Sequence, residues 1–411
     1  MTERSWPVVK LGHTARIGNG STPRRDSTIY WDDGDIPWLN SSVVNESRVT
    51  QAEQFVTAAA LRECHLPVVA PGSVLVGLTG QGKTRGMATI LEIEATINQH
   101  IAYVTPERNR WHPGYLLWSL RAAYDELRRL SEENGSTKGG LTCEALKQFR
   151  LTLPPVGYQR AICDYLDRET ARIDTLIEEQ QRLIEMLRER RRVLVTRAVC
   201  FGVDEDIELR DSGDPIVGLV PRHWAVKAVR YWMESLDGQR IPLSSEERAD
   251  RRGDFDYYGA SGVIDQVDDY LFDEPLVLVS EDGANLLMRS TPIAFAARGR
   301  YWVNNHAHVL RPLSNGDVDY WAQRLEVLDV TTVVSGSAQP KLTAGALMGL
   351  RVSAPEDVDE QRRIAAYLAE QTSKIDSLIA ESERFIELSR ERRAALITAV
   401  VTGQIDVREV T

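Results

Sequence analysis

"QRAICDYLDRETARIDTLIEEQQRLIEMLRERRRVLVT" (residues 159–196) is followed later in the chain by a second version of the same stretch, "QRRIAAYLAEQTSKIDSLIAESERFIELSRERRAALIT" (residues 361–398). When the two are aligned without a gap, 20 of 38 positions are identical. Self-similarity of this kind is the signature of a duplicated structural unit. We therefore predict that the chain consists of two similar halves.

Each copy is predicted to be one long helix, because neither contains Pro or Gly and Glu, Gln, Arg, Leu and Ile dominate. Apolar residues recur every eleven positions, or 3.67 per turn, which suits a nearly straight helix. This first stripe comprises Ile162, Ile173, Ile184 and Val195, in register with Ile364, Ile375, Ile386 and Ile397. A second stripe comprises Tyr165, Leu176, Leu187 and Ala198, in register with Tyr367, Leu378, Ser389 and Val400. A long helix must bury such a surface, so we expect the two copies to pair with each other. Because the first copy leads from the first half to the second, a twofold-like relation of the halves makes the pair antiparallel.

The repeat extends upstream into a globular part, or head, in each half. "NGSTKGGLTCEALKQFRLTLP" (134–154) matches "SGSAQPKLTAGALMGLRVSAP" (335–355), and "NQHIAYVTP" (98–106) matches "NNHAHVLRP" (304–312). Between these anchors the halves diverge. Runs rich in β-branched residues predict strands at 74–78, 88–92, 101–105, 276–280, 293–297 and 308–311. Apolar spacing predicts helices at 115–130 and 320–328.

The predicted fold class is therefore α/β (α+β): two globular recognition domains joined by two long antiparallel helices in a pseudo-twofold internal repeat. The predicted boundaries are 1–153 for the first head, 154–203 for the first helix, 204–355 for the second head and 356–411 for the second helix.

Composition narrows the class of protein. The chain of 411 residues has a net charge of −11, and by direct count residues 1–203 carry +2 while residues 204–411 carry −13. DNA binding therefore needs local positive charge and is helped by basic partners. No apolar run is long enough to span a membrane, and no export signal is recognised. The four cysteines have no paired spacing, which fits free thiols in the cytoplasm and argues against a zinc site.

Two variable heads, each followed by a repeated helix that begins with Gln-Arg, resemble the specificity subunit of type I restriction–modification enzymes. The resemblance covers nearly the whole chain and is carried by both helix copies and by "IYWDDGDIPWLN" (29–40), "YYGASGVIDQVDDYLFDEPLVLVSEDGAN" (257–285) and "WVNNHAHVLRP" (302–312). It implies that each head is a target recognition domain that reads one half of an asymmetric, bipartite double-stranded DNA sequence. It also implies that the helices fix the gap and dock two modification (methyltransferase) subunits, which restriction (endonuclease) subunits join.

Candidate contact residues follow from charge and from loop chemistry. The DNA-binding candidates are Lys83, Thr84 and Arg85 in the first head, and Arg251, Arg252, Arg298, Arg300, Tyr301 and Lys341 in the second. The basic runs late in each helix favour the helix dipole and acidic partner subunits rather than DNA. The partner-binding candidates are Arg188, Arg191, Arg390 and Arg393.

"GLTGQGKT" (77–84) fits the phosphate-loop pattern and offers a different function, a nucleotide hydrolase that uses Lys83 and Thr84. A true loop of this kind opens a helix, whereas residues 85–90 are typical of a turn and then a strand. A coincidental match is therefore the preferred interpretation. A third alternative is a coiled-coil adaptor with no role in DNA binding.

No catalytic signature is found, and the subunit is predicted to be non-catalytic, without cofactor or metal. His306 and His308 lie two apart on a predicted strand, which resembles a metal pair. No cysteine or third histidine lies near them, and Asn98 and His100 repeat the pattern in the first half. We therefore expect these histidines to form structural hydrogen bonds.

Overall fold

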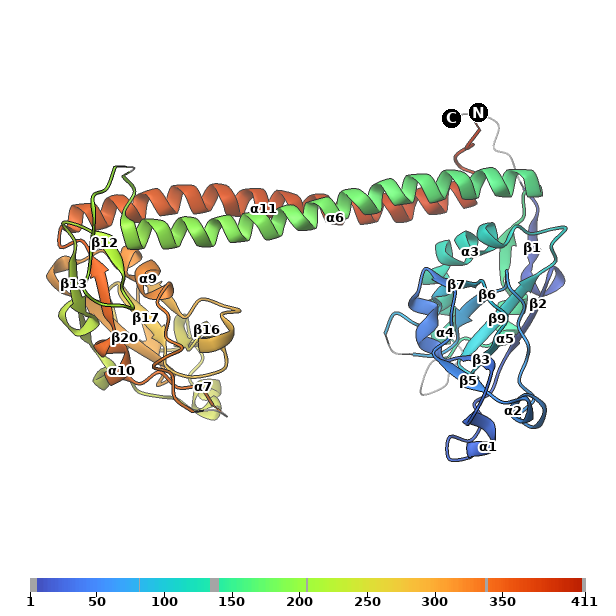
Figure 1. The fold of residues 1–411 in the computed structure, drawn as a ribbon, viewed down its shortest axis with the longest axis horizontal. Helices are drawn as coiled ribbons and strands as arrows, with labels where there is room; N and C mark the ends of the chain where they lie inside the picture. The colour runs from blue at the N-terminus through green and yellow to red at the C-terminus, as the bar shows by residue number, and fades with distance from the viewer. Residues whose placement is uncertain (1–5, 81, 134–139, 205, 337–338, 409–411) are drawn as a thin grey trace. The chain divides into compact units, whose positions relative to one another are not determined.

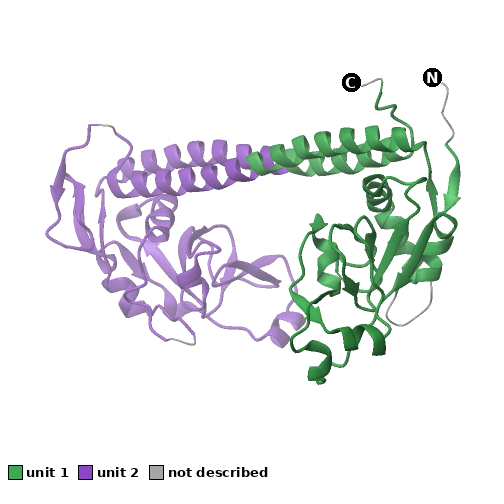
Figure 2. Cartoon of the chain, turned by 45° about the vertical axis from the view of Figure 1, so that its right-hand side comes forward, with its two compact units in different colours: residues 1–180, 384–411 green, residues 181–383 purple. Residues whose placement is uncertain are grey.

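The computed structural model describes residues 6–80, 82–133, 140–204, 206–336 and 339–408. The chain forms two compact units, residues 1–180 with 384–411 and residues 181–383 (Figure 2). Each unit contains one head and a part of both long helices, α6 (Val156–Phe201) and α11 (Val358–Val401). The predicted fold class of two mixed heads and two long helices is confirmed.

The first head is built on a five-stranded sheet with the order β2-β9-β6-β7-β4 (Figure 1). These strands are Ala15–Asn19 (β2), Ile101–Pro106 (β9), Val74–Gly77 (β6), Ala88–Leu91 (β7) and Arg48–Val49 (β4). A three-stranded sheet has the order β5-β3-β8, with Gln54–Val56 (β5), Ile36–Leu39 (β3) and Thr96–Ile97 (β8). Its helices are Thr28–Trp31 (α1), Ala58–Glu63 (α2), Pro113–Ala122 (α3), Tyr124–Glu133 (α4) and Cys143–Gln148 (α5).

The second head repeats this plan. Its main sheet has the order β14-β20-β17-β18, with Met233–Ser235 (β14), Ala307–Pro312 (β20), Leu276–Ser280 (β17) and Ala294–Ala297 (β18). A three-stranded sheet has the order β16-β15-β19, with Gly262–Val267 (β16), Phe255–Gly259 (β15) and Tyr301–Val303 (β19). A hairpin of β11 (Leu209–Asp211) and β12 (Leu219–Pro221) precedes them. Its helices are Ser245–Asp250 (α7), Asn285–Met288 (α8), Val318–Glu326 (α9) and Ala344–Gly349 (α10).

In both heads a strand from the N-terminal part pairs with the last strand before the long helix. β1 (Val8–Lys10) is antiparallel to β10 (Arg150–Thr152), and β13 (Ala225–Ala228), which follows the hairpin, is antiparallel to β21 (Arg351–Ala354). The N-terminal part and the end of each head are thus held together directly before the helix that follows.

The six predicted strands are all present within one or two residues of their predicted bounds. The predicted helix at 115–130 is wrong as a single element, because α3 and α4 are separate and meet at Ala123. α3 is buried almost all round, from Tyr115 to Leu120, so its apolar residues do not define a single face. α4 is amphipathic and begins after this break. The second predicted helix is α9, which begins two residues earlier, where the Asp317 side chain accepts a hydrogen bond from the Tyr320 N–H.

The two long helices run antiparallel. In the first unit, Ile162 and Leu166 near the start of α6 share a core with Ile397 and Val400 near the end of α11. In the second unit the order is reversed, because the residues Val195, Ala198 and Val199 near the end of α6 share a core with Ile364 and Leu368 near the start of α11. Among the described residues no helix is both long and apolar enough to cross a bilayer.

The first predicted stripe forms the contact between the helices, since seven of its eight residues are buried and Ile173 is half-buried. The second stripe is only partly buried: Leu187, Ala198 and Val400 are covered, but Leu176, Tyr367 and Leu378 are 44%, 39% and 49% exposed. Two paired helices cover only a narrow seam of each other, and residues at its rim keep part of their surface in solvent. Apolar surface is therefore left uncovered on both helices.

Candidate DNA interface

A buried glutamine at the start of each long helix fixes that helix to its head. Gln159 Nε2 donates to the main-chain oxygens of Arg110 and Pro154, both at 2.7 Å, and its Oε1 accepts from the His112 N–H at 2.6 Å. Gln361 Nε2 donates to the oxygen of Pro355 at 2.8 Å, and its Oε1 accepts from the Asp317 N–H at 2.9 Å. The Gln of the repeated Gln-Arg start is thus the joint between head and helix.

Three of the four predicted partner-binding arginines are used between the helices. Arg191 Nε lies 3.0 Å from Asp376 Oδ1, and Arg393 Nε lies 2.8 Å from Asp174 Oδ1. The two pairs join equivalent positions of the repeat, one in each unit. Arg188 lies 3.2 Å from Glu383. Arg390 is exposed, and no ion pair is found for it among the residues that the structure describes.

The uncovered apolar residues of the two helices occupy the same positions of the repeat. On α6 they are Leu176, Leu183, Met186 and Val193, and on α11 they are Leu378, Phe385 and Leu388. The spacing of 176, 183, 186 and 193 is the seven-residue pattern of helix packing, and the equivalents 378, 385 and 388 keep it. We name these residues the outer seam. In the second unit a groove of about 530 Å³ follows it, with Met186, Val193 and Arg197 in its lining.

The glycine-rich loop of the first head is not a phosphate loop. It leads from β6 into β7, a strand, and its ends meet where the Gly86 N–H donates to the oxygen of Gly77 at 2.8 Å. Since a strand and not a helix follows the loop, no helix N-terminus faces the place of a phosphate. The match to the phosphate-loop pattern is therefore coincidental, as expected. Of the three candidates here, Lys83 is exposed, Thr84 accepts from Asn45 Nδ2 at 3.4 Å, and Arg85 lies 3.1 Å from Glu132.

Most cations predicted to bind DNA in the second head have carboxylate partners of their own. Arg251 contacts Asp268 and stacks on Trp302, and the other pairs are Arg298–Asp319 at 2.6 Å, Arg300–Asp273 at 3.1 Å and Lys341–Glu281 at 3.1 Å. For exposed Arg252 no ion pair is found in the described part of the chain. The structure does not bring these residues into one cluster, and each pair must open before a phosphate can bind.

Tyr301 is wrong as a DNA-contact candidate, because its side chain is fully buried. Its hydroxyl donates to the oxygen of Glu274 at 2.8 Å, and burial raises its pKa. The sequence showed an aromatic beside two arginines, but alternation along β19 points Tyr301 into the core.

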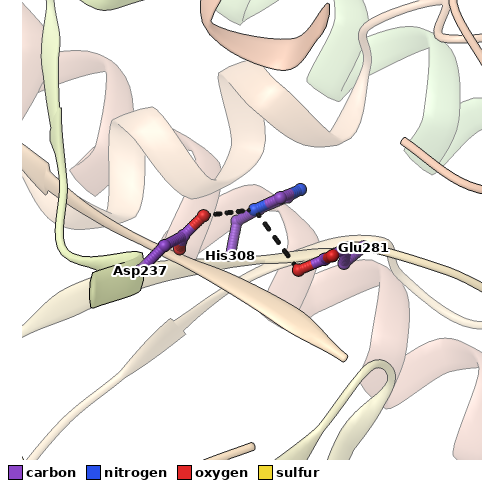
Figure 3. A group of neighbouring side chains, drawn as sticks. All are labelled: Asp237, Glu281 and His308. Atoms are coloured by element: carbon purple, nitrogen blue, oxygen red, sulfur yellow. Dashed lines mark hydrogen bonds and ion pairs between the residues drawn. The ribbon is translucent and has the colours of Figure 1, made fainter. Parts of the chain in front are cut away.

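Within the same head, Asp237, Glu281 and His308 form a largely buried charged cluster (Figure 3). His308 Nδ1 lies 2.6 Å from Asp237 and 3.7 Å from Glu281, and its Nε2 lies 2.8 Å from the oxygen of Leu342. Arg240 lies 2.7 Å from Glu281, and Lys341 contacts the same carboxylate. With these cations already on both carboxylates, the cluster fits an ion network better than a metal site.

The electrostatics of the cluster agree with this interpretation. Burial alone would raise the pKa of Asp237, but hydrogen bonds from His308 and from the Val309 N–H outweigh burial and lower it. Burial would also raise the pKa of Glu281, but hydrogen bonds from Arg240 and Lys341 outweigh burial and lower it. His306 Nδ1 lies 2.7 Å from Asp282. The predicted hydrogen-bonding role of His306 and His308 is therefore confirmed.

A set of uncharged polar residues at one end of the first head's main sheet was missed by sequence reasoning. It comprises Asn19, Thr22, Thr79, Gln99 and His100, which come from three separate loops and form hydrogen bonds with one another. In the second head, strand register places Asp237, Arg240, Asp282, Asn305 and His306 at the corresponding positions. The signal that could have found the first set is the absence of acidic residues from those loops.

Comparison with known proteins agrees with this architecture. The family model described as "Type I restriction modification DNA specificity domain" matches residues 3–186 and again residues 221–385. An Escherichia coli "Type I restriction enzyme EcoR124I/EcoR124II specificity subunit" is 20% identical over 185 residues, 45% of each chain. A "Type I restriction enzyme MjaIX specificity subunit" of Methanocaldococcus jannaschii is 27% identical over 188 residues, 45% of this chain and 41% of the relative. The matched regions thus span less than half the length of these relatives.

Solved structures share the fold of the whole chain. A chain from work on "complex assembly" and "conformational transition of the type I R-M system" aligns with a TM-score of 0.74 at 14% identity, over 98% of this chain and 99% of that one. The HsdS subunit from Thermoanaerobacter tengcongensis aligns with a TM-score of 0.58 at 14% identity, over 98% of both chains. At such identity the likeness concerns the fold and not individual contacts.

Proposed function

Because the chain belongs to the family of type I restriction modification DNA specificity domains, we propose that it is the sequence-recognition subunit of a type I restriction–modification complex. In this function it catalyses no reaction itself. It selects an asymmetric, bipartite sequence in double-stranded DNA, at which its partners act. The observation that carries the proposal is the pair of heads, which share strand order and helix joint but differ in the loops at the corresponding sheet end.

Differences between the loops argue for two different half-sites. Base identity is read by side chains that reach base edges, whereas phosphate contacts only set the register. The sheet-end loops are neutral or basic in the first head and rich in paired charges in the second. We assign residues 1–153 and 204–355 to the two recognition domains and residues 154–203 and 356–411 to the spacer helices, which limit the permitted gap as fixed half-site spacing does in dimeric readers.

The outer seam supports the docking of two copies of one partner. Its exposed apolar residues repeat on α6 and α11, so the two helices offer the same surface twice. Contiguous exposed apolar residues mark interaction surfaces. We assign the seam to two modification subunits, with Arg390 as a flanking cation, and restriction subunits then join that core. The other predicted partner-binding residues, Arg188, Arg191 and Arg393, form ion pairs between the helices.

A head exchange tests the function. The full-length chain is co-expressed with its modification subunits, and methylated sites are mapped at single-base resolution. Replacing residues 1–153 with the first head of another family member is expected to change one half-site and leave the other half-site unaltered. A chain that still directs methylation to the original whole sequence would contradict the proposal.

The two other candidate functions give different results. A nucleotide hydrolase would turn over ATP in isolation and lose that activity on Lys83→Ala. For an adaptor without a DNA role, the assembled complex would show no salt-sensitive binding of duplex DNA. The nucleotide hydrolase has no supporting observation, since the glycine-rich loop enters a strand.

A further inference from the structure

A tight turn in each head exposes one amide side chain at its tip. In the first head the turn joins β8 to β9, and Asn98 Oδ1 accepts from the His100 N–H at 2.9 Å. Asn98 is buried. Gln99, which lies between Asn98 and His100 at the tip of the turn, is exposed. The second head repeats the turn, with Asn304 Oδ1 accepting from the His306 N–H at 2.8 Å. The exposed tip there is Asn305.

The Gln99 amide is held on both sides. Thr22 Oγ1 donates to Gln99 Oε1 at 2.6 Å, and Gln99 Nε2 lies 3.2 Å from His100 Nε2. The other ring nitrogen of His100 lies 2.9 Å from Thr79 Oγ1. An amide oxygen accepts two hydrogen bonds and an amide nitrogen donates two, so these contacts leave one acceptor and one donor position on Gln99. The amide is therefore fixed with a donor and an acceptor still available.

The surrounding loops suit a polyanion. Residues 19–25, 40–45, 77–87 and 97–100 contain no Asp or Glu and four basic residues, although the whole chain carries −11. Arg24 and Arg85 are paired with Asp26 and Glu132 outside these ranges. For Arg25 and Lys83 no ion pair is found among the described residues. The Arg25 guanidinium lies 4.2 Å from the centre of the Trp31 ring and donates to Gln54 at 2.8 Å. Local positive charge beside neutral hydrogen-bonding groups is the combination that holds a phosphate backbone while bases are read.

We propose that Gln99 reads an adenine in the half-site of the first head and that Asn305 is its counterpart in the second. A Gln or Asn amide matches adenine in the major groove, donating to N7 and accepting from the N6 amino group. Thr22 and His100 are positioning residues for the Gln99 amide, and Arg25 and Lys83 contact phosphates. This inference rests on the proposed function, because it names the chemistry by which that function selects its sequence.

Gln99 and Asn305 differ in how firmly neighbouring side chains hold their amide groups. His306, the neighbour of Asn305, is turned to the Asp282 carboxylate at 2.7 Å, and no hydrogen bond to the Asn305 side chain is found among the described residues. Asn305 is thus less pre-organised than Gln99. We expect a stronger base preference at the Gln99 position, since a held side chain loses less freedom on binding.

The test is selection of duplexes from a random pool by the full-length chain assembled with its modification subunits, followed by sequencing. Gln99→Ala is expected to remove the preference for one A·T pair in one half-site, with discrimination there falling roughly 5- to 150-fold. Asn305→Ala does the same in the other half-site. Thr22→Val, which removes only the hydroxyl that holds the amide, weakens preference at the same base pair as Gln99→Ala but by less.

The matched control is Gln148→Ala, which removes an exposed amide of the same head at α5, where it bonds to Glu144 and Lys10. It leaves every position of the selected sequence unchanged. If Gln99→Ala weakens binding equally to all sequences, or shifts a G·C position, the adenine assignment is overturned while the function stands. If the complex with the unaltered chain enriches no sequence, the proposed function fails and this inference fails with it.

Discussion

At the scale of single residues, the joint between head and helix depends on Gln159 and Gln361, which are buried and bonded in the same way. The repeat indicated that these positions matter, but not what they bond to, because their partners are main-chain groups up to 49 residues away. Most of the predicted DNA-contact arginines of the second head are paired with carboxylates, which the sequence did not indicate for a related reason. Whether a cation is available depends on carboxylates that folding brings to it, and no local pattern shows them.

The joint makes a prediction about stability. Gln159→Leu and Gln361→Leu each leave buried main-chain groups without partners, and each unsatisfied group costs about 1–3 kcal/mol. We expect each variant to lower the free energy of unfolding by about that amount or more, measured by urea denaturation. Gln181→Leu, at an exposed position of α6, serves as the control and is nearly neutral. Equal midpoints for all three variants would contradict the assigned role.

The buried ion network makes a prediction about pH. Asp237 and Glu281 have lowered pKa values in the folded chain, so the unfolded chain binds more protons as acid is added. Their stabilisation is complete above the ordinary carboxyl values and is lost as pH falls through the lower folded values, below about pH 4. Asp237→Asn is therefore expected to flatten the loss of stability in this range. Urea midpoints between pH 3 and pH 6 measure it, and a slope identical to that of the unaltered chain would refute it.

At the scale of elements, the long helices were predictable because their pattern is local and occurs twice. The break between α3 and α4 was not, because a fully buried helix has no polar face to mark its direction. The buried and exposed apolar stripes of the long helices also differ in how well the sequence predicted them. An eleven-residue period identified the contact between the helices. Of the outer seam only Leu176 and Leu378 lie in a predicted stripe, and the seam as a whole became visible only from exposure.

The outer seam predicts a separation of binding from folding. Met186→Glu on α6 and Leu388→Glu on α11 place a charge on exposed apolar surface, so neither should lower the melting temperature by more than a few degrees. Each is expected to abolish one of two binding events with the modification subunit, and the double variant both, as measured by analytical ultracentrifugation. Ile386→Ala, in the buried seam, is the contrasting variant and costs about 2–5 kcal/mol of stability. Unchanged stoichiometry in the double variant would remove the seam from the interface.

At the scale of the whole molecule, charge is distributed unevenly: the first half is nearly neutral and the second carries all of the excess negative charge. Most predicted DNA-contact cations of the second head are paired with carboxylates. In the sheet-end loops of the first head Arg24 and Arg85 are paired in the same way, whereas no ion pair is found for Arg25 and Lys83 among the described residues. The first head should therefore supply most of the electrostatic attraction to DNA.

This asymmetry is measurable as salt dependence. Lys83→Ala and Arg25→Ala are each expected to lower the slope of log binding constant against log salt concentration by about one, because each removes one phosphate contact. Arg298→Ala should change the slope by much less, since its charge is already balanced by Asp319. Fluorescence anisotropy over a series of salt concentrations gives the slopes. Equal decreases for all three variants would show that the heads share the attraction equally.

Within the described part of the chain, every hydrogen bond of the Gln159 and Gln361 side chains is formed with a main-chain group and none with another side chain. A joint of this kind does not depend on which amino acids the head presents to DNA. Heads with unrelated surfaces can consequently be mounted on the same helix as long as their backbone path is kept. Such an attachment lets recombination exchange sequence preferences wholesale, while point mutations refine them in the loops without disturbing assembly.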